Sequence, residues 1–472
     1  MALKDVPRIL VGVLGYTGSG KSSLINALLD HELLLPCNAM RASTSVVVEV
    51  AYNRSDDPKA AYCAEIDFVT RKEWIKELEI LQGEIKDRHE REPIGTKSGS
   101  EASAAFAKIT AVYPDIDIEK ISTIRPEDLL QVQDLSEILG KSKTIHESKV
   151  KPFYSQISSF VDSKNTAKSV GQVAFWPLVK LVKIHVKAPV LKNGLVLVDL
   201  PGLGDSNAGR TTVAENYIQN LQHIWICADI VRAVDDQVAK DLLGRGFRRQ
   251  LLLDGRYHED FVSFIMTKTD NINTNEVIRS LSLEELALKD IIRQEDEIKE
   301  GIDEAEERLE GLKQKLKDCK KGSKKRKHSE IEIEDADQKT DSLDENPKQQ
   351  PKDERKTLIK LQKRLEKEIE QLKSELSKLN VSMKAICIEE RNEYTRGRLQ
   401  EDFEGGLREL LQDMDEAGNE DSTITTKGNG ALRSFCVSSK AYQKIKGRFK
   451  RDQVCRLNSD SIQQGSRADL HI

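Results

Sequence analysis

A glycine-rich stretch near the amino terminus has residue types and spacing suited to holding phosphate. Residues 15–22 read GYTGSGKS, a Gly-x-x-x-x-Gly-Lys-Ser pattern. A glycine-rich turn that opens a helix aims backbone N–H groups and the positive end of the helix dipole at an anion. We expect Lys21 to reach the β- and γ-phosphates of a nucleotide, and the hydroxyl of Ser22 to ligate Mg²⁺.

This motif leaves the choice of base open. Because Gly18 is also a glycine, the loop equally fits ATPases of the ABC and SMC types. Residues 195–199 (LVLVD) even read as the strand that ends in the metal-binding acid of such an ATPase. An SMC-like ATPase with a coiled-coil insert is therefore an alternative, although the sequence contains no L-S-G-G signature.

Three later stretches favour guanine over adenine. Asp199 continues to Gly202 as D-x-x-G, where GTPases place an acid near Mg²⁺ and a glycine N–H at the γ-phosphate. The stretch from Thr267 to Asp270 (TKTD) matches [N/T]-K-x-D, and its carboxylate can accept hydrogen bonds from guanine N1–H and the 2-amino group. Adenine offers no such pair of donors, so one aspartate can discriminate strongly. Residues 438–440 (SSK) resemble the S-A-K loop, whose backbone N–H meets guanine O6.

A first switch is expected just before the second strand. Residues 43–45 read Ser-Thr-Ser, and a threonine hydroxyl there would close on Mg²⁺ when the γ-phosphate is present. An ordinary Ser/Thr turn before a strand is almost as good an interpretation. With Thr44 included, the predicted metal ligands are Ser22, Thr44 and Asp199, and the predicted catalytic residues are Lys21, Ser22, Thr44 and Gly202.

The elements that must position these residues form an α/β pattern. Strand-like apolar runs occur at 8–14, 45–52, 62–69, 181–186, 195–200, 224–234, 261–266 and 434–437. Residues 22–35 read as a helix, and residues 62–69 are a candidate partner of 45–52. Apolar strands separated by helices predict a P-loop fold with a mostly parallel sheet and helices on both faces.

Two insertions interrupt this predicted core. Leu365, Ile369, Leu372 and Leu376 continue a 4, 3, 4, 3 spacing, which is typical of a coiled-coil seam. A matching seam precedes it, so an antiparallel hairpin is expected; two independent surface helices are the alternative. The predicted organisation is core 1–70, helical insertion 71–170, core 171–280, coiled-coil hairpin 281–388 with a disordered tip at 318–355, core 389–445 and a disordered or truncated tail 446–472.

The composition and charge of the chain limit which partners and which cellular environment are expected. Charged residues make up 32% and hydrophobic residues 38% of the chain, which indicates one packed core with long solvated helices. The net charge of −5 gives no general footprint for nucleic acid. Seven cysteines without C-x-x-C spacing predict a reduced intracellular protein. Six cations within residues 320–327 predict nuclear import; a solvated charge run in an otherwise cytoplasmic protein is the alternative, and contact with DNA is left open.

With these motifs assembled, the chain resembles the dynamin-family large GTPases. The resemblance is carried by GYTGSGKSSLINALL, FWPLVKLVKIHV (175–186), LVLVDLPGLGDSNAGR (195–210), TKTD and FCVSSKAY (435–442). It is greatest to a nuclear type in which a W-P-L strand precedes V-D-L-P-G-x-G-D. It implies GTP/GDP and Mg²⁺ as ligands, bound by Gly15, Thr17, Gly18, Ser19, Gly20, Lys21, Ser22, Ser23, Asp199, Gly202, Thr267, Lys268, Asp270, Ser438, Ser439 and Lys440.

Departures from the family pattern change the expected activity. Dynamins usually carry Gln-Ser where this chain has Thr17 and Gly18, and no glutamine follows D-x-x-G, where Leu203 stands. Leucine cannot orient water, so we expect slow hydrolysis. Only 32 residues follow Lys440, so we also expect a product without the family's helical stalk. A hydrolysis-poor GTP-binding scaffold, whose coiled coil docks protein partners or a second copy, is the non-enzyme alternative.

Overall fold

The computed structural model describes residues 7–36, 46–89, 101–116, 118–132, 135–161, 174–201, 217–234, 261–285, 287–329, 350–416 and 432–448. The chain divides into two compact units. The sheet unit comprises Met1–Asn271 and Asn392–Asp452, and the helix-pair unit comprises Ile272–Arg391 and Gln453–Ile472.

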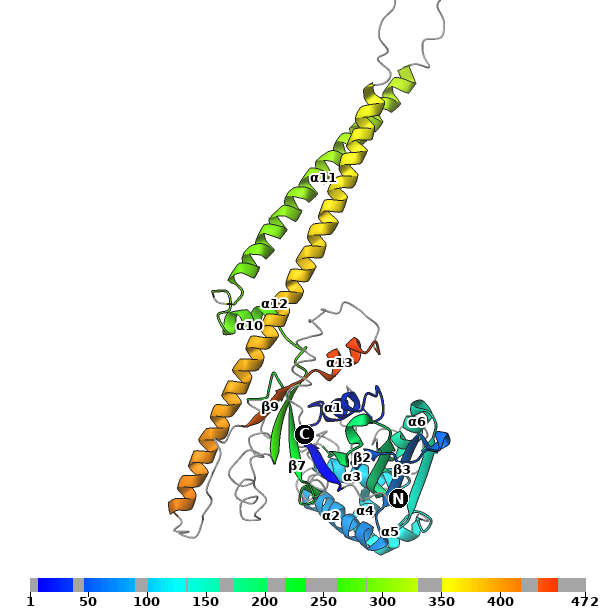
Figure 1. Ribbon diagram of the computed structural model, residues 1–472. Helices are drawn as coiled ribbons and strands as arrows, with labels where there is room; N and C mark the ends of the chain where they lie inside the picture. Colours follow the sequence, from blue (N-terminus) through cyan, green and yellow to red (C-terminus); the bar gives the residue numbers. More distant parts are fainter. Residues whose placement is uncertain are drawn as a thin grey trace, which may run out of the picture. The chain divides into compact units, whose positions relative to one another are not determined.

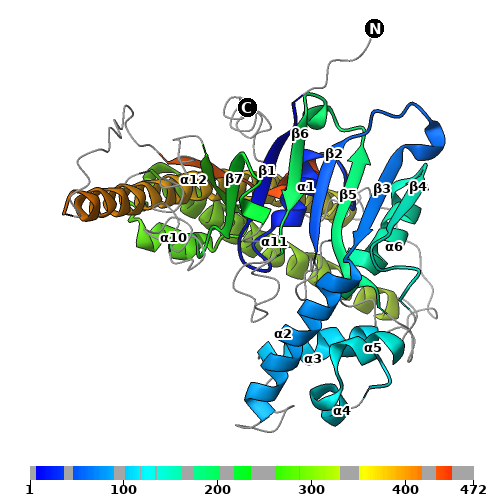
Figure 2. The same ribbon diagram turned by 90° about the horizontal axis from the view of Figure 1, so that it is seen from below.

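One mixed sheet is the framework of the sheet unit (Figure 1). In the described part of the chain its order is β4-β3-β5-β2-β6-β1-β7-β8-β9, and Figure 2 shows most of these strands side by side. The strands are β1 (Ile9–Leu14), β2 (Val47–Tyr52), β3 (Tyr62–Phe68), β4 (Ser142–Glu147), β5 (Val179–Val186), β6 (Leu195–Asp199), β7 (His223–Asp229), β8 (Val262–Thr267) and β9 (Arg433–Cys436).

Most strand pairs in this sheet are parallel. Strand β1 pairs in parallel with β6 and β7, β2 with β5, β7 with β8, and β8 with β9. The antiparallel pairs are β2 with β6, β3 with β4 and β3 with β5. The expected mostly parallel α/β sheet is therefore confirmed. The expected pairing of 62–69 with 45–52 is wrong, because β5 lies between β2 and β3 and pairs with both.

The core lies on both faces of the sheet. Alternate residues of a strand point to opposite faces, and β2 shows this directly. Val48 and Val50 belong to one buried apolar cluster, whereas Val47 belongs to a second. Strand β1 likewise divides Val11 and Leu14 between the two clusters. This two-sided burial explains why these strands read as almost unbroken apolar runs.

Helix α1 (Lys21–Leu28) is shorter than the expected helix at 22–35. The chain leaves the helix at Leu29, and Asp30 takes the left-handed conformation with φ 61°. The side-chain carbonyl of Asn26 then accepts hydrogen bonds from the N–H groups of Leu34 and Leu35. Those bonds fold the segment back on the helix and allow Leu34 and Leu35 to be buried without helical structure.

The insertion predicted at 71–170 is not purely helical. Its apolar spacing does give a helix, in which Trp74, Leu78 and Leu81 are buried. However, β4 also lies in this stretch and pairs with β3, so the insertion extends the sheet. Its helices are α2 (Arg71–His89), α3 (Glu101–Val112), α4 (Ile118–Thr123), α5 (Pro126–Val132) and α6 (Val150–Val161). The remaining described helices of the sheet unit are α13 (Ser439–Ile445) and the 3₁₀ turns η1 (Pro58–Ala60), η3 (Trp176–Leu178) and η4 (Pro189–Leu191).

The helix-pair unit contains α10 (Thr274–Ser280), α11 (Lys289–Ser329) and most of α12 (Gln350–Glu416). Figure 1 shows α11 and α12 side by side in opposite directions. Leu309 and Leu312 pack with Leu365 and Ile369 between them. The nitrogen of Lys373 lies 2.6 Å from a carboxylate oxygen of Glu306 across the pair.

The ends of these helices differ from the sequence prediction. Helix α11 continues to Ser329 and α12 begins at Gln350, so 318–329 and 350–355 are helical rather than disordered; 330–349 lies outside the described residues. Helix α12 also continues past 388, and its last part supplies Leu399 and Phe403 to the second apolar cluster of the sheet unit. Among the described helices none has an apolar stretch long enough to cross a bilayer.

Candidate nucleotide-binding site

Most predicted site residues lie at one edge of the sheet. Strand β1 ends at Leu14 and leads through the glycine-rich loop into α1, and β6 ends at Asp199. Strand β8 ends at Thr267, and β9 is followed by Ser438 at the start of α13. Because these strands are parallel, their carboxyl ends meet at the same edge, which is where ligands bind in open α/β sheets.

Two glycines of the loop have a positive φ and close neighbours, both of which disfavour a side chain. Gly15 has φ 143°, and a Cβ there would lie 2.1 Å from the carbonyl oxygen of Cys227. Gly20 has φ 94° and would place a Cβ 3.3 Å from the hydroxyl of Thr267. Burial raises the pKa of the Cys227 thiol to about 12, so this thiol beneath the loop stays neutral. The loop is therefore pressed against β7 and β8.

The lysine of the motif is buried and faces the loop. Its ammonium nitrogen donates hydrogen bonds to the carbonyl oxygens of Gly15 at 2.9 Å and Tyr16 at 3.0 Å. Lys21 is 6% exposed. A buried ammonium must be paired with acceptors, and here the acceptors belong to the loop that the motif predicts to hold phosphate. A phosphate oxygen is a stronger acceptor for the same ammonium.

Ser22 and Asp199 meet directly. The hydroxyl of Ser22 donates a hydrogen bond of 2.6 Å to a carboxylate oxygen of Asp199, and Asp199 is 1% exposed. Hydroxyl and carboxylate oxygens are ligands suited to Mg²⁺, which usually takes only one or two protein groups beside water and phosphate. The donor set therefore fits the predicted metal. Thr44 and Gly202, the other predicted metal and phosphate contacts, lie outside the described residues.

Thr267 supports the phosphate loop from beneath. Its hydroxyl donates a hydrogen bond of 2.5 Å to the carbonyl oxygen of Ser19, and the carbonyl oxygen of Ala228 lies 3.1 Å from the same hydroxyl. Thr267 is 2% exposed. This placement ties the T-K-x-D stretch to the glycine-rich loop, so the two predicted halves of the site are held together by one side chain.

The predicted guanine-reading carboxylate is oriented by the S-S-K loop. The hydroxyl of Ser438 donates a hydrogen bond of 2.6 Å to Asp270 and accepts one of 3.0 Å from the N–H of Ala441. Ser438 is thus also the N-cap of α13. The backbone N–H of Thr269 further donates to the carbonyl of Val437. Residues separated by more than 160 positions in sequence are brought together here.

The remaining predicted residues occupy the ends of α1, α13 and the loop. Ser23 lies in the first turn of α1, Ser439 and Lys440 begin α13, and Thr17 and Gly18 lie at the turn of the glycine-rich loop. Lys268 has a left-handed φ of 57°, and its ammonium lies 3.0 Å from a carboxylate oxygen of Asp229. Sequence reasoning missed Asp229, although an acid directly after the β7 run was a usable signal.

Sequence reasoning also missed the contacts that hold α13 on α1. Tyr442 donates a hydrogen bond of 2.9 Å to Asp30, and Arg448 lies 3.2 Å from the same oxygen. Burial tends to raise the pKa of Asp30, but the Tyr442 hydrogen bond and the charges of Lys446 and Arg448 outweigh it and lower this pKa. No local pattern marked Asp30, because its partners are about 412 positions away.

Comparison with known proteins points to one family. Residues 11–243 match the family model described as the dynamin family. The chain is 28% identical over 301 residues to the nuclear GTPase SLIP-GC of Mus musculus, and 27% identical over 288 residues to that of Homo sapiens. These matches cover 60% and 58% of this chain but only 35% and 34% of the relatives, so the matched part spans about a third of their length.

Solved structures of an oligomerised bacterial dynamin pair are also similar. One is 18% identical with a TM-score of 0.33 and covers 61% of this chain and 31% of its own. Another is 16% identical with a TM-score of 0.34 and covers 88% of this chain and 46% of its own. The ordered motifs, their position at one edge of a mostly parallel sheet and the family match agree with one another. Residues 11–243 of the chain therefore fit a dynamin-family GTPase domain.

Proposed function

We propose that this chain binds guanine nucleotide with Mg²⁺ and hydrolyses GTP slowly to GDP and phosphate. The observation that carries the proposal is the carboxylate of Asp270, which Ser438 orients beside a glycine-rich loop containing Lys21 and Ser22. The match of residues 11–243 to the dynamin family favours the same activity. The cycle would drive a conformational or assembly change.

The phosphate half of the proposed mechanism works by positioning and charge. Lys21 would exchange its loop carbonyls for β- and γ-phosphate oxygens and stabilise the charge that develops between them. Ser22 and Asp199, already joined by a hydrogen bond, would hold Mg²⁺. When bound, Mg²⁺ supplies charge neutralisation at the bridging oxygens. Thr44 and Gly202 are proposed to complete the contacts to Mg²⁺ and to the γ-phosphate.

The base half would read guanine with Asp270. Its carboxylate would accept from guanine N1–H and the 2-amino group, while the backbone at Ser439 or Lys440 donates to O6. Lys268 would lie along the base, with its ammonium steered by Asp229. Thr267 contributes indirectly, by fixing the loop at Ser19.

We expect slow GTP hydrolysis because the side chains that position the attacking water in related GTPases are absent from this sequence. Thr17 and Gly18 replace the Gln-Ser pair that positions water and a monovalent cation in dynamins, and Leu203 stands where some GTPases carry glutamine. Without these side chains only the backbone can hold the attacking water, so turnover should be slow and independent of the monovalent cation.

Phosphate release from the purified chain tests this function. GTP and ATP are supplied at equal concentration, with Lys21→Ala as the negative control. We expect slow release from GTP, none from ATP and none from the variant. Equal release from ATP, or ATP displacing bound GTP, would favour the SMC-like ATPase and overturn the proposal.

A GTP-binding scaffold is the second candidate, and the same missing side chains favour it. Tight GTP binding without phosphate release beyond that of Lys21→Ala would select it. In that case the pair α11–α12 is the proposed docking arm for protein partners or a second copy, since it carries its seam inward and charged residues outward. Sedimentation of the chain with GDP and with a non-hydrolysable GTP analogue tests self-association.

Nuclear localisation is a further proposal. The relatives are named nuclear GTPases, and residues 320–327 contain six cations. Replacing Lys324, Lys325 and Arg326 with alanine in a fluorescent fusion should move the protein out of the nucleus. Unchanged nuclear fluorescence would contradict an import role for this cluster.

A further inference from the structure

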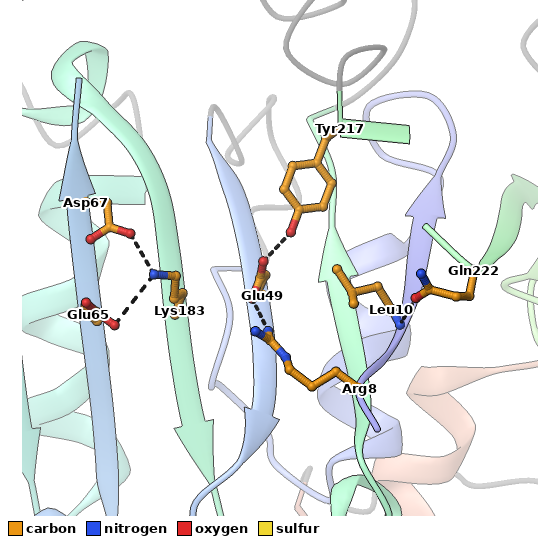
Figure 3. A network of polar contacts seen from close by, with 8 residues as sticks. All are labelled: Arg8, Leu10, Glu49, Glu65, Asp67, Lys183, Tyr217 and Gln222. Atoms are coloured by element: carbon orange, nitrogen blue, oxygen red, sulfur yellow. Dashed lines mark hydrogen bonds and ion pairs between the residues drawn. The ribbon is translucent and has the colours of Figure 1, made fainter. Parts of the chain in front are cut away.

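A buried carboxylate interrupts the apolar strand β2. Glu49 is 6% exposed and stands between Val48 and Val50, which are fully buried. It has two partners, drawn in Figure 3. Arg8 lies 2.6 Å from one carboxylate oxygen, and the hydroxyl of Tyr217 donates a hydrogen bond to the other. Burying a carboxylate is costly unless it is paired, and Glu49 is paired at both of its oxygens.

Glu49 and Tyr217, which share one of these hydrogen bonds, each follow a segment that is predicted to sense the γ-phosphate. Strand β2 begins two residues after the predicted first switch at 43–45, and its Val48 pairs with Asp199. Tyr217 lies fifteen positions after Gly202, on the chain that continues from D-x-x-G towards β7. The Glu49–Tyr217 hydrogen bond therefore joins the chain after one predicted γ-phosphate sensor to the chain after the other.

The chain around Tyr217 is anchored, so a displacement there can be transmitted. Ile218 and Leu221 are buried in the apolar cluster that also contains Val47. The side chain of Gln222 accepts a hydrogen bond of 2.7 Å from the N–H of Leu10 in β1 (Figure 3). Burial and the Glu49 carboxylate raise the pKa of the Tyr217 phenol, so it remains a hydrogen-bond donor across the physiological range.

We propose that Glu49 and Tyr217 are positioning residues for GTP hydrolysis, because their hydrogen bond couples β2 to the chain that follows D-x-x-G. The inference rests on the proposed function and adds two residues that touch neither nucleotide nor metal. Coupling of this kind acts when both segments must take one arrangement together. Loss of the bond leaves each segment to respond alone, so turnover falls while nucleotide affinity is retained.

The same face of the sheet provides a matched control. Lys183 of β5 lies 2.8 Å from Asp67 and 3.7 Å from Glu65, both in β3 (Figure 3). Asp67 also accepts a hydrogen bond of 2.6 Å from Ser142. Neither β3 nor β5 follows a predicted switch. Asp67→Asn therefore removes a carboxylate contact on the same face and leaves the Glu49–Tyr217 hydrogen bond itself in place.

Turnover and affinity should be measured on the full chain and on Tyr217→Phe, Glu49→Val, the double variant and Asp67→Asn. Tyr217→Phe keeps the ring and removes only the donor. We expect kcat to fall about tenfold in each single variant, with KM and the Kd for GDP unchanged. The double variant should lose no more than Glu49→Val alone, because that variant already removes the Tyr217 hydrogen bond together with the Arg8 ion pair. Asp67→Asn should behave as the parent chain.

A second readout keeps the test independent of hydrolysis. In the parent chain, hydrogen exchange at residues 46–52 and 217–222 should change together between GDP and a non-hydrolysable GTP analogue. In Tyr217→Phe only one of the two segments should respond. Parental kcat and parental exchange in Tyr217→Phe would overturn the coupling while leaving the proposed function intact. An equal loss of kcat in Asp67→Asn would mean that Glu49 and Tyr217 only support the fold. No hydrolysis by the parent chain would overturn the proposed function, and the exchange measurement would then decide the coupling alone.

Discussion

The phosphate end and the base end of the candidate site are organised in different ways. At the phosphate end, Lys21 is bonded to carbonyls of its own loop and Ser22 to Asp199. At the base end, Asp270 is oriented by Ser438, whose helix α13 is bonded to Asp30, two residues after the end of α1. The contacts at the phosphate end are ones that a ligand must exchange, whereas those at the base end can persist when a ligand binds.

This difference predicts that the phosphate end sets how tightly a nucleotide binds and that the base end sets which base is preferred. Exchange at the phosphate end replaces neutral carbonyl acceptors with charged phosphate oxygens, which strengthens binding of any nucleoside di- or triphosphate. A preorganised carboxylate at the base end costs nothing to orient on binding and leaves a buried acceptor unsatisfied when the wrong base arrives. Substitutions at the phosphate end should therefore weaken all nucleotides alike, and those at the base end should change which nucleotide is preferred.

The largest effect is expected for Lys21→Ala. Removing the ammonium should weaken GTP and GDP by a few hundredfold and abolish turnover, because this ammonium is the buried charge that lies against the loop carbonyls. Titration with a fluorescent guanine nucleotide measures the loss. Lys187→Ala, which removes an exposed ion pair with Asp56, is the control and should bind normally. A variant at position 21 that still binds GDP tightly would show that the phosphate end is built elsewhere.

Asp270→Asn should give the next largest effect, and a selective one. Asparagine presents a donor where guanine also presents a donor, so GTP should bind about a hundredfold more weakly. Xanthine offers a carbonyl at that position and should gain affinity. Competition between GTP and XTP for the parent and the variant gives the ratio. Equal weakening of both nucleotides would mean that position 270 acts on the fold and does not read the base.

The phosphate end was more predictable from sequence than the base end. The strand-loop-helix context of residues 15–22 is local, and it predicted β1, the loop and the start of α1 correctly. The length of α1 was overestimated, since leucines at 33–35 continue the helical spacing. What ends the helix is the side chain of Asn26, whose backbone contacts no periodicity reports.

Long-range contacts account for most of the remaining errors. The motif at 267–270 was visible, but its contact with Ser438 spans 168 positions, and the Asp30 contact with Tyr442 spans 412. Strand β4 was hidden because SKTIHE is polar and mostly exposed at the edge of the sheet. Edge strands need no apolar run, so hydrophobic pattern alone reads such a stretch as a loop.

Ser438→Ala should weaken GTP binding moderately, and it separates the orientation of the Asp270 carboxylate from its charge. The variant keeps the Asp270 carboxylate but removes the hydroxyl that donates to it at 2.6 Å. We expect about fivefold weaker GTP binding and a smaller penalty for ITP, which lacks the 2-amino group. Loss of the N-cap should also destabilise α13 by about 1 kcal/mol. Ser439→Ala controls for a hydroxyl in the same turn; a fivefold loss there as well would assign the effect to helix stability.

The smallest effect is a dependence on pH at the base end. Burial first, and the charge of Arg448 second, lower the pKa of His31, whose backbone carbonyl accepts a hydrogen bond from Gln443 of α13. The unfolded chain then binds the His31 proton more readily than the folded chain. The stabilisation from neutral His31 is present above the ordinary pKa of about 6.5 and is lost as pH falls below it. A charged ring would also repel Arg448, one of the groups that hold Asp30.

GTP affinity should therefore fall between about pH 7 and pH 5.5 more steeply in the parent chain than in His31→Gln. His185→Gln is the matched control, because burial also lowers the pKa of His185 but this residue lies in β5, which contributes no predicted site residue. Its loss should alter the pH dependence of unfolding and leave that of GTP binding unchanged. The same slope for GTP binding in all three proteins would mean that α13 is held firmly enough without His31, and that preorganisation of the base end depends on Asp30 and Ser438 alone.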